Sequence, residues 1–340
     1  MAFAVTIVCA CRNERAHIAQ FLESLAHLDR TGLALDAIIA DGCSTDGTRA
    51  ILDDFSASHP WCRIIDNPGA IVSTGLNQAI RLARGEYIVR MDAHTLYEPA
   101  YVARCIAVLT QTGASNAGGP QRSRATGYWQ RAIHAGFHSA FASGGARFRD
   151  DNYSGPADTA PYGCWPREFL VAIGLFDETL VRNQDDELNL RARLRGGTIW
   201  QDASIVSHYY PRSSLGGLWR QYLQFGFWRV AVLRKHPGEG SLRHFVPAAA
   251  VLIGLALLAM ILSGVVRRPA LMSLALLAIL YAVLSVYASI RAASREGWDL
   301  LPALPLTFAV YQAAYATGFC AGLVYWWLPR RGPVPHAFRT

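Results

Sequence analysis

Short apolar runs and amphipathic segments alternate along the first hundred residues. Runs rich in β-branched residues, typical of buried strands, occupy 4–11, 35–40, 63–65 and 86–91. Apolar positions with helical spacing occupy 18–28, 48–55 and 73–84. This order predicts an α/β fold in which a mostly parallel sheet carries helices on both faces.

Polar residues mark the edge of this sheet where a ligand is expected. Ligands of parallel sheets bind beyond the carboxyl ends of the strands. Asn13, Asp41 and Asp92 each follow a predicted strand. Farther along, the pattern predicts a long mobile loop at 143–159, an amphipathic helix at 185–194 and a last strand at 198–206.

The final hundred residues are almost continuously apolar. Before them, 215–240 is an aromatic-rich amphipathic region that we expect to lie on a membrane surface, although a core-facing helix would show the same pattern. Membrane helices, which need about 20 apolar residues, are predicted at 245–266, 269–290 and 302–328. Prolines near the start of the third leave open whether it spans or re-enters. The predicted organisation is a domain at 1–214, the interfacial region at 215–240, membrane helices within 241–330 and a tail at 331–340.

The charge distribution follows this division. Residues 1–240 carry 24 basic and 23 acidic side chains, whereas 241–340 carry 8 and 2. A basic second part with few charges fits membrane segments with cationic flanks, and it argues against a nucleic-acid surface. Met1–Ala10 is too short and lacks the basic start of a secretory signal, so we expect the first part to stay in the cytoplasm.

Each of three acidic motifs can be explained either by a role in ligand chemistry or by local structure alone. Asp41 opens a glycine-containing turn that could bind a nucleobase or ribose, or only cap the next helix. Asp92 and His94 alternate onto one side, where they could hold a divalent cation on a diphosphate or be unrelated. The acidic sequence at 184–187 opens a helix, where it gains from the helix dipole or supplies a general base.

In this order the motifs resemble the family 2 glycosyltransferases, inverting enzymes with the GT-A nucleotide-diphospho-sugar transferase fold. The resemblance covers about residues 4–235 and rests on VTIVCACRNE, IIADGCSTDGT, GEYIVRMDAHT, AIGLFDE and NQDDELNLRARLRGG. The Met-Asp-Ala-His form and the Gln-Tyr-x-x-x-Gly-x-Trp-Arg helix are similar to the membrane-bound subgroup that builds succinoglycan-type exopolysaccharides.

The resemblance implies roles for individual residues. Asp185 would be the catalytic base. Asp92 and His94 would hold a divalent cation, Mn²⁺ or Mg²⁺. The nucleotide-sugar donor would be bound by Asn13, Glu14, Asp41 and Asp92.

Three departures from the family pattern bear on these roles. Gly42 stands where many members have a second Asp, His94 ends the metal motif in place of Asp, and Gln184 replaces the usual Glu before the base. The identity of the metal is therefore open. Asp186 or Glu187 would be the base in a shifted register, because a helix turns about 100° per residue and only one of the three can face the donor.

The implied function is transfer of a hexose from a nucleotide-diphosphate donor to a polyprenyl-diphosphate-linked glycan in exopolysaccharide or cell-surface polysaccharide biosynthesis. The resemblance favours UDP, and no residue distinguishes it from GDP or dTDP. We expect a multi-pass protein of the cytoplasmic membrane with its catalytic domain in the cytoplasm.

Two alternatives remain open at this point. The acceptor could be polyprenyl phosphate itself, whose anion would need basic residues near the base; the nearby arginines are Arg191, Arg193 and Arg195. The chain could also be an inactive membrane scaffold with a degenerate transferase domain. Retention of Asp41, Asp92 and Asp185 together argues against the scaffold.

Overall fold

The computed structural model describes residues 2–264, 266–328 and 332–338. It divides into two compact units. The first contains Met1–Arg124 and Arg147–Tyr210, and the second contains Ala125–Ala146 and Pro211–Thr340. The division near 210 lies close to the predicted domain end at 214, but the hydrophobic pattern gave no sign that 125–146 would join the second unit.

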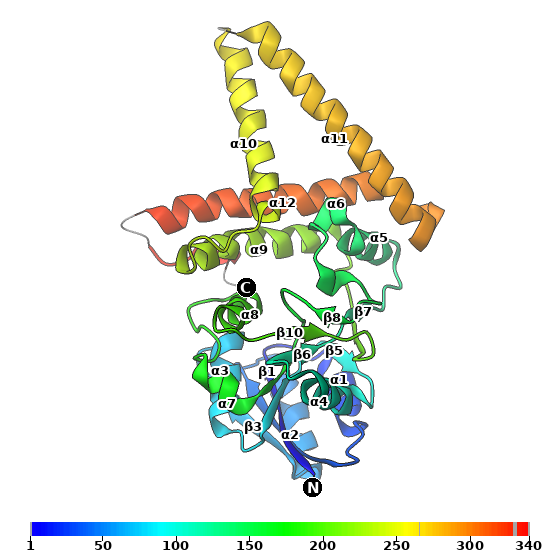
Figure 1. The fold of residues 1–340 in the computed structure, drawn as a ribbon, viewed down its shortest axis with the longest axis vertical. Coiled ribbons are helices and arrows are strands. Elements are labelled where there is room, and N and C mark those ends of the chain that lie inside the picture. The colour runs from blue at the N-terminus through cyan, green and yellow to red at the C-terminus, as the bar shows by residue number, and fades with distance from the viewer. Residues whose placement is uncertain (1, 265, 329–331, 339–340) are drawn as a thin grey trace. The chain divides into compact units, whose positions relative to one another are not determined.

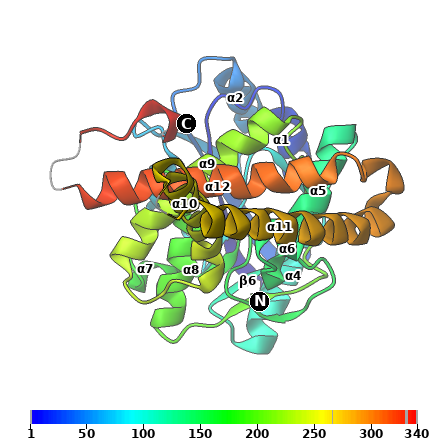
Figure 2. The ribbon, with the colours of Figure 1, turned by 90° about the horizontal axis from the view of Figure 1, so that it is seen from above.

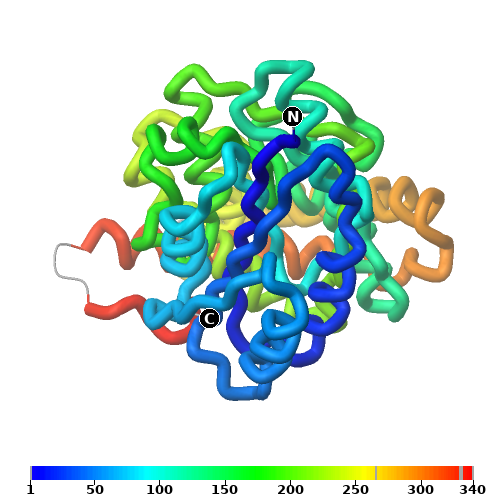
Figure 3. Tube along the Cα trace, turned by 90° about the horizontal axis from the view of Figure 1, so that it is seen from below, coloured from blue at the N-terminus to red at the C-terminus, as the bar shows by residue number. Residues whose placement is uncertain are grey.

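The first unit is built on an eight-stranded sheet with the order β3-β2-β1-β4-β9-β6-β10-β8. Four parallel strands form one side of it, β1 (Phe3–Cys11), β2 (Leu33–Asp41), β3 (Cys62–Asp66) and β4 (Tyr87–Arg90). The other strands are β6 (Asn116–Gly118), β8 (Gly155–Pro156), β9 (Cys164–Pro166) and β10 (Ile199–Gln201). β9 runs antiparallel to both β4 and β6, so the sheet is mixed but mostly parallel, as predicted. β1 and β2 lie side by side through the middle of the unit (Figure 3).

A second sheet of three short strands orders β5-β11-β7. Its strands are β5 (Thr95–Tyr97), β7 (Gln121–Ser123) and β11 (Ser207–Tyr209). The predicted loop at 143–159 contains the 3₁₀ turn η1 (Arg147–Arg149) and the two-residue β8. The predicted strand at 198–206 is shorter, because only Ile199–Gln201 pairs with neighbours.

Helices cover both faces of the main sheet, as the β-α alternation predicted. Ile7 and Cys9 of β1 point into one core, whereas Val8 points into the other. The helices of the first core are α1 (Ile18–Ala26), α2 (Thr48–Ser58) and α4 (Tyr101–Thr112). The helices of the second core are α3 (Val72–Leu82), α7 (Arg167–Ala172) and α8 (Gln184–Leu194). This alternation buries β1 on both sides. The strand order places the carboxyl end of β1 between those of β2 and β4.

The regular elements described in the second unit are all helices. It contains α5 (Tyr128–His138), α6 (Ala140–Ser143), α9 (Leu215–Lys235), α10 (Leu242–Ser263), α11 (Arg267–Glu296), α12 (Leu304–Trp327) and the 3₁₀ turns η2 (Trp298–Leu300) and η3 (His336–Phe338). In Figure 1, α9 and α12 run alongside each other, and α10 and α11 rise from them as a hairpin. Arg131 of α5 binds the carboxylate of Asp299 and the carbonyl of Glu296, which ties the inserted segment to the end of α11.

Only α10 and α11 have the length and composition of membrane-crossing helices among the residues that the structure describes. Their apolar windows have mean hydropathies of 2.7 and 2.3, and almost all of their side chains are exposed. The third predicted span forms α12, which lies across the foot of the hairpin in Figures 1 and 2 and packs along α9. A third crossing therefore stays a prediction.

Glycines bring α9 and α12 into direct backbone contact. A methyl group on Gly226 of α9 would overlap the carbonyl oxygen of Tyr315, and one on Gly318 of α12 would overlap the carbonyl oxygen of Leu223. The two helices therefore approach more closely than any larger residue would allow.

Gly226→Ala should destabilise this helix pair, because the new methyl group has nowhere to go. We expect the free energy of unfolding to fall by about 1–3 kcal/mol, the usual cost of overpacking. Gly216→Ala, in the same helix, is the matched control, because a methyl group there meets no atom within 4 Å. Thermal unfolding in detergent would measure both, and equal melting temperatures would contradict the close contact.

Candidate active site

The loops after β1 and β2 are joined by reciprocal hydrogen bonds. The backbone N–H of Asn13 donates to Ser44 Oγ at 2.9 Å, and Asn13 Oδ1 accepts from the backbone N–H of Thr45 at 2.9 Å. The N–H of Glu14 donates to Thr48 Oγ1 at 2.9 Å. Asn13 has a φ of 55°, a left-handed conformation that Asn tolerates. The Asn13 side chain thus holds the two loops together, and its predicted contact with a donor stays a prediction.

Asp41 ends β2 as a buried carboxylate with an unused acceptor. It is 3% exposed, and its Oδ2 accepts a 3.3 Å hydrogen bond from the N–H of Ser44 and lies 3.9 Å from Arg49 Nη1. Its Oδ1 is buried and has no hydrogen-bond partner among the residues that the structure describes. A buried carboxylate oxygen normally has a donor. The arrangement leaves an acceptor at the ligand edge for an N–H or O–H group of a bound molecule.

Arg90 connects the two other acidic motifs. Its side chain is 5% exposed, and its Nε and Nη2 donate to the two carboxylate oxygens of Asp92 at 3.0 and 3.1 Å. Its Nη1 lies 3.6 Å from Asp185 Oδ2 and makes no hydrogen bond to a residue that the structure describes. The guanidinium also lies 5.8 Å from the centre of the Phe176 ring. One side chain therefore holds the strand-end carboxylate in a two-point bond and faces the helix carboxylate.

The electrostatics of Arg90 follow from these neighbours. Burial by itself would lower the pKa of the Arg90 guanidinium, but the carboxylates of Asp92 and Asp185 outweigh burial and raise the pKa above its ordinary value. Arg90 is therefore permanently charged. One cation between two anions leaves a net negative site.

Asp185 lies in the first turn of α8 and faces Arg90. Desolvation by the surrounding atoms raises the pKa of the Asp185 carboxyl, and the charge of Arg90 opposes the increase. The side chain is nevertheless 38% exposed, so it is open to solvent. Glu187 is 2% exposed and is bound by Arg191 through 2.7 and 2.8 Å hydrogen bonds, which assigns it to packing. Of these two acids, Asp185 is the one that is open to solvent, and its role as a base stays a prediction.

The metal motif offers two side chains. Asp92 is fixed by Arg90 and by a 2.7 Å hydrogen bond from its backbone N–H to Tyr97 Oη. His94 is half exposed, and its Nδ1 lies 3.2 Å from Glu14 Oε1. Within the described ranges, no group of three or more His, Cys, Asp or Glu side chains could hold a metal ion. A metal role for Asp92 and His94 therefore stays a prediction.

Sequence reasoning missed Arg90. The signal was present, because residues two apart in a strand face the same side, and Arg90 precedes Asp92 by two. An arginine in an otherwise apolar strand needs a partner, and Asp92 was the nearest acid on that face. Arg191 was considered for a ligand-binding role, but it is occupied by Glu187 and by the carbonyls of Ile173 and Leu175.

Comparison with known proteins places this chain in a family. The family "Glycosyl transferase family 2" matches residues 6–167. The succinoglycan biosynthesis protein ExoA of Rhizobium meliloti (strain 1021) is 33% identical over 72% of this chain and 74% of its own length. A glycosyltransferase of Methanococcus voltae, named for adding a diacetamido-dideoxy-glucuronosyl group to dolichyl N-acetylglucosaminyl phosphate, is 24% identical over 94% of this chain and 97% of its own.

A solved structure agrees at the level of the fold. The mannosyltransferase PcManGT of Pyrobaculum calidifontis, in complex with GDP-Man and Mn²⁺, matches with a TM-score of 0.59 at 18% identity and covers 94% of this chain and 86% of that one. The main sheet of the first unit and its helices are thus those of the GT-A fold. With this fold and the ExoA match, the chain is a glycosyltransferase that belongs to family 2.

Proposed function

We propose that this chain is an inverting glycosyltransferase that moves a sugar from a nucleotide-diphosphate donor to a lipid-linked oligosaccharide in exopolysaccharide or cell-surface polysaccharide biosynthesis. The observation that carries the proposal is the Arg90 side chain, which binds Asp92 and faces Asp185. It keeps a donor-side carboxylate and a candidate base next to each other, as a displacement at the anomeric carbon requires.

The proposed step is a single displacement. Asp185 accepts the proton of the acceptor hydroxyl, whose oxygen forms a bond to the anomeric carbon of the donor sugar. The bond from that carbon to the diphosphate oxygen breaks on the opposite face, and the nucleoside diphosphate leaves with the electron pair. Arg90 faces Asp185, and the raised pKa makes Asp185 a stronger base than an ordinary aspartate.

The donor would lie along the carboxyl ends of β2, β1 and β4. β1 separates β2 from β4, so Asp41 and Asp92 follow strands two spacings apart, about 10 Å. Oδ1 of Asp41 would accept from the nucleoside, with Asn13 and Glu14 in the adjoining loop. UDP remains the proposed nucleotide, although the fold neighbour holds GDP-Man. When bound, a divalent cation held by Asp92 and His94 would neutralise charge on the leaving diphosphate.

The acceptor proposal rests on relatives and on the apolar hairpin. The relative from Methanococcus voltae is named for a dolichyl-phosphate-linked sugar acceptor, and its similarity extends over both units of this chain. The α10–α11 hairpin would insert such a protein into the bilayer that holds the lipid. We propose a multi-pass protein of the cytoplasmic membrane whose catalytic unit faces the cytoplasm.

The first test replaces the proposed base. Asp185→Asn keeps the size of the side chain but accepts no proton, so we expect transfer to fall by about 10²–10⁴-fold. Asp186→Asn is the matched control and should retain most activity. In the wild type, kcat/KM should fall as the pH drops through the Asp185 pKa, which lies above the ordinary aspartate value. Release of nucleoside diphosphate in the presence of membrane-extracted acceptor lipids measures the activity of both variants and the pH profile of the wild type.

The result can contradict the assignment in two ways. If Asp186→Asn is the inactive variant, the base is Asp186. If donor binds to the wild type but no lipid acceptor or donor gives turnover, the chain is an inactive scaffold.

A second test concerns the Arg90 guanidinium, which binds both oxygens of Asp92 and faces Asp185. Arg90→Lys keeps the charge, but an ammonium cannot hold both oxygens of Asp92 and face Asp185 as well. We expect kcat to fall by about 10²-fold with a smaller change in the donor KM, because misplaced catalytic groups cost rate more than binding. Arg81→Lys, in an exposed pair with Glu178, is the control and should have no effect. Added guanidinium ion should restore part of the kcat of Arg90→Ala, and an unchanged kcat in Arg90→Lys would refute this role.

A third test addresses the cation. EDTA should abolish transfer, and Mn²⁺ or Mg²⁺ should restore it. His94→Ala should raise the metal concentration needed for half-maximal activity about tenfold, as loss of one ligand-shell partner does. Full activity of the wild type in EDTA would show that the cation is dispensable.

A further inference from the structure

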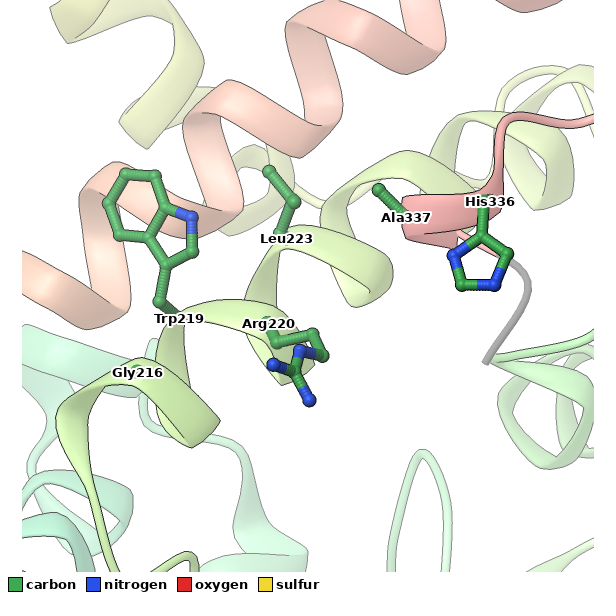
Figure 4. A pocket seen from close by; sticks show the side chains of 6 residues that line it. All are labelled: Gly216, Trp219, Arg220, Leu223, His336 and Ala337. Atoms are coloured by element: carbon green, nitrogen blue, oxygen red, sulfur yellow. The ribbon is translucent and has the colours of Figure 1, made fainter.

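A second candidate binding site lies in the helical unit. A cavity of about 500 Å³ opens between the first turns of α9 and the 3₁₀ turn η3. Its walls are Gly216, Trp219, Arg220, Leu223, His336 and Ala337 (Figure 4). This volume is in the range of small-molecule sites. None of these residues takes part in the proposed displacement step.

The η3 turn, which forms one wall of the cavity, is bound to α9 by side-chain contacts. The indole Nε1–H of Trp228 donates to the carbonyl of Phe338 at 2.8 Å, and Gln224 Nε2 donates to the carbonyl of Ala337 at 3.2 Å. The rings of Phe227 and Phe338 stack with centroids 3.9 Å apart. These three contacts from α9 hold η3 in place, so His336 is presented to the cavity by a pinned segment and not by a loose tail.

The lining separates into a polar and an apolar part. The Arg220 guanidinium and the His336 imidazole supply hydrogen-bond donors, and no lining residue is acidic. Arg220 is exposed, and no residue that the structure describes neutralises it with an ion pair. Trp219 and Leu223 supply apolar surface on the same helix. An anion with an attached hydrocarbon chain satisfies both parts at once.

The position of α9 in its own unit favours a lipid as the source of that anion. α9 packs along α12, and the apolar hairpin α10–α11 rises from the same pair of helices (Figure 1). Tryptophan and arginine side chains are typical of the membrane–water interface. A lone phosphate would leave most of a 500 Å³ cavity empty.

We propose that this cavity binds the phosphate-bearing head of the lipid-linked acceptor. Arg220 forms charge-assisted hydrogen bonds to phosphate oxygens, His336 donates a second bond, and Trp219 with Leu223 contacts the first hydrocarbon units of the lipid. This assignment rests on the proposed function in one respect, that the acceptor is carried on a lipid.

The test measures binding of farnesyl diphosphate, a short polyprenyl diphosphate, to the full-length protein in phosphatidylcholine nanodiscs. We expect Arg220→Ala to weaken binding about tenfold or more, because a hydrogen bond to a charged group is lost. Arg220→Lys should fall between the two, and His336→Ala should have a smaller effect. Arg212→Ala is the matched control, because it removes an exposed positive charge just before α9 without lining the cavity.

Further arms distinguish the sources of the phosphate. Inorganic pyrophosphate should bind more weakly than farnesyl diphosphate, and replacing part of the phosphatidylcholine by phosphatidylglycerol should compete little. Equal affinity for pyrophosphate would overturn the lipid assignment in favour of a free-phosphate site. Strong competition by phosphatidylglycerol would overturn it in favour of a bilayer lipid. Unchanged affinity in folded Arg220→Ala, verified by its thermal unfolding, would remove the site altogether.

The failure of this site and the failure of the proposed function give different results. Asp185→Asn should bind farnesyl diphosphate as the wild type does and yet transfer no sugar. If the wild type binds the lipid but transfers no sugar from any donor, the proposed function fails and the site stands. If Arg220→Ala transfers sugar with the wild-type acceptor KM, the site fails and the function stands.

Discussion

The ion pair between Arg90 and Asp92 is the interaction on which the arrangement of the catalytic unit depends. A buried guanidinium is costly unless its charge is balanced, and here both oxygens of Asp92 balance it. The same guanidinium also faces Asp185, which belongs to α8, almost a hundred residues later in the chain. The end of β4 and the start of α8 are thereby coupled electrostatically. Loss of Arg90 would leave two carboxylates near each other without a cation between them.

The topology of the sheet determines which groups lie at the same edge as the Arg90–Asp92 ion pair. Asp41, Cys11 and Asp66 are aligned across three parallel strands, so the buried acceptor of Asp41 stands beside the loop that carries Asn13 and Glu14. The loops after β1 and β2 hold each other through side chain-to-backbone bonds. The ligand edge is therefore preformed in this respect, and a donor would not need to organise it.

Much of this could be predicted from the sequence, for physical reasons that also explain the rest. Parallel strands buried on both faces are continuously apolar, so β1, β2 and β4 were evident. β5, β6 and β7 have three residues each, too few for an alternation to be visible. The strand-end rule singled out Asp41 and Asp92, and the family resemblance singled out Asp185; their roles stay predictions. Arg90 was treated as part of a strand, and the contact of His94 with Glu14 depends on loops that no local pattern specifies.

The backbone contact between α9 and α12 has a mechanical consequence. Helices separated by a layer of side chains can slide, because rotamers absorb small displacements. At Gly226 and Gly318 that layer is missing, so side-chain rotamers cannot absorb a displacement between the two helices at this contact. If the apolar hairpin crosses a bilayer as proposed, a change in its tilt would reach α9 through these backbone contacts with α12. The thickness and curvature of that bilayer would then influence the position of α9.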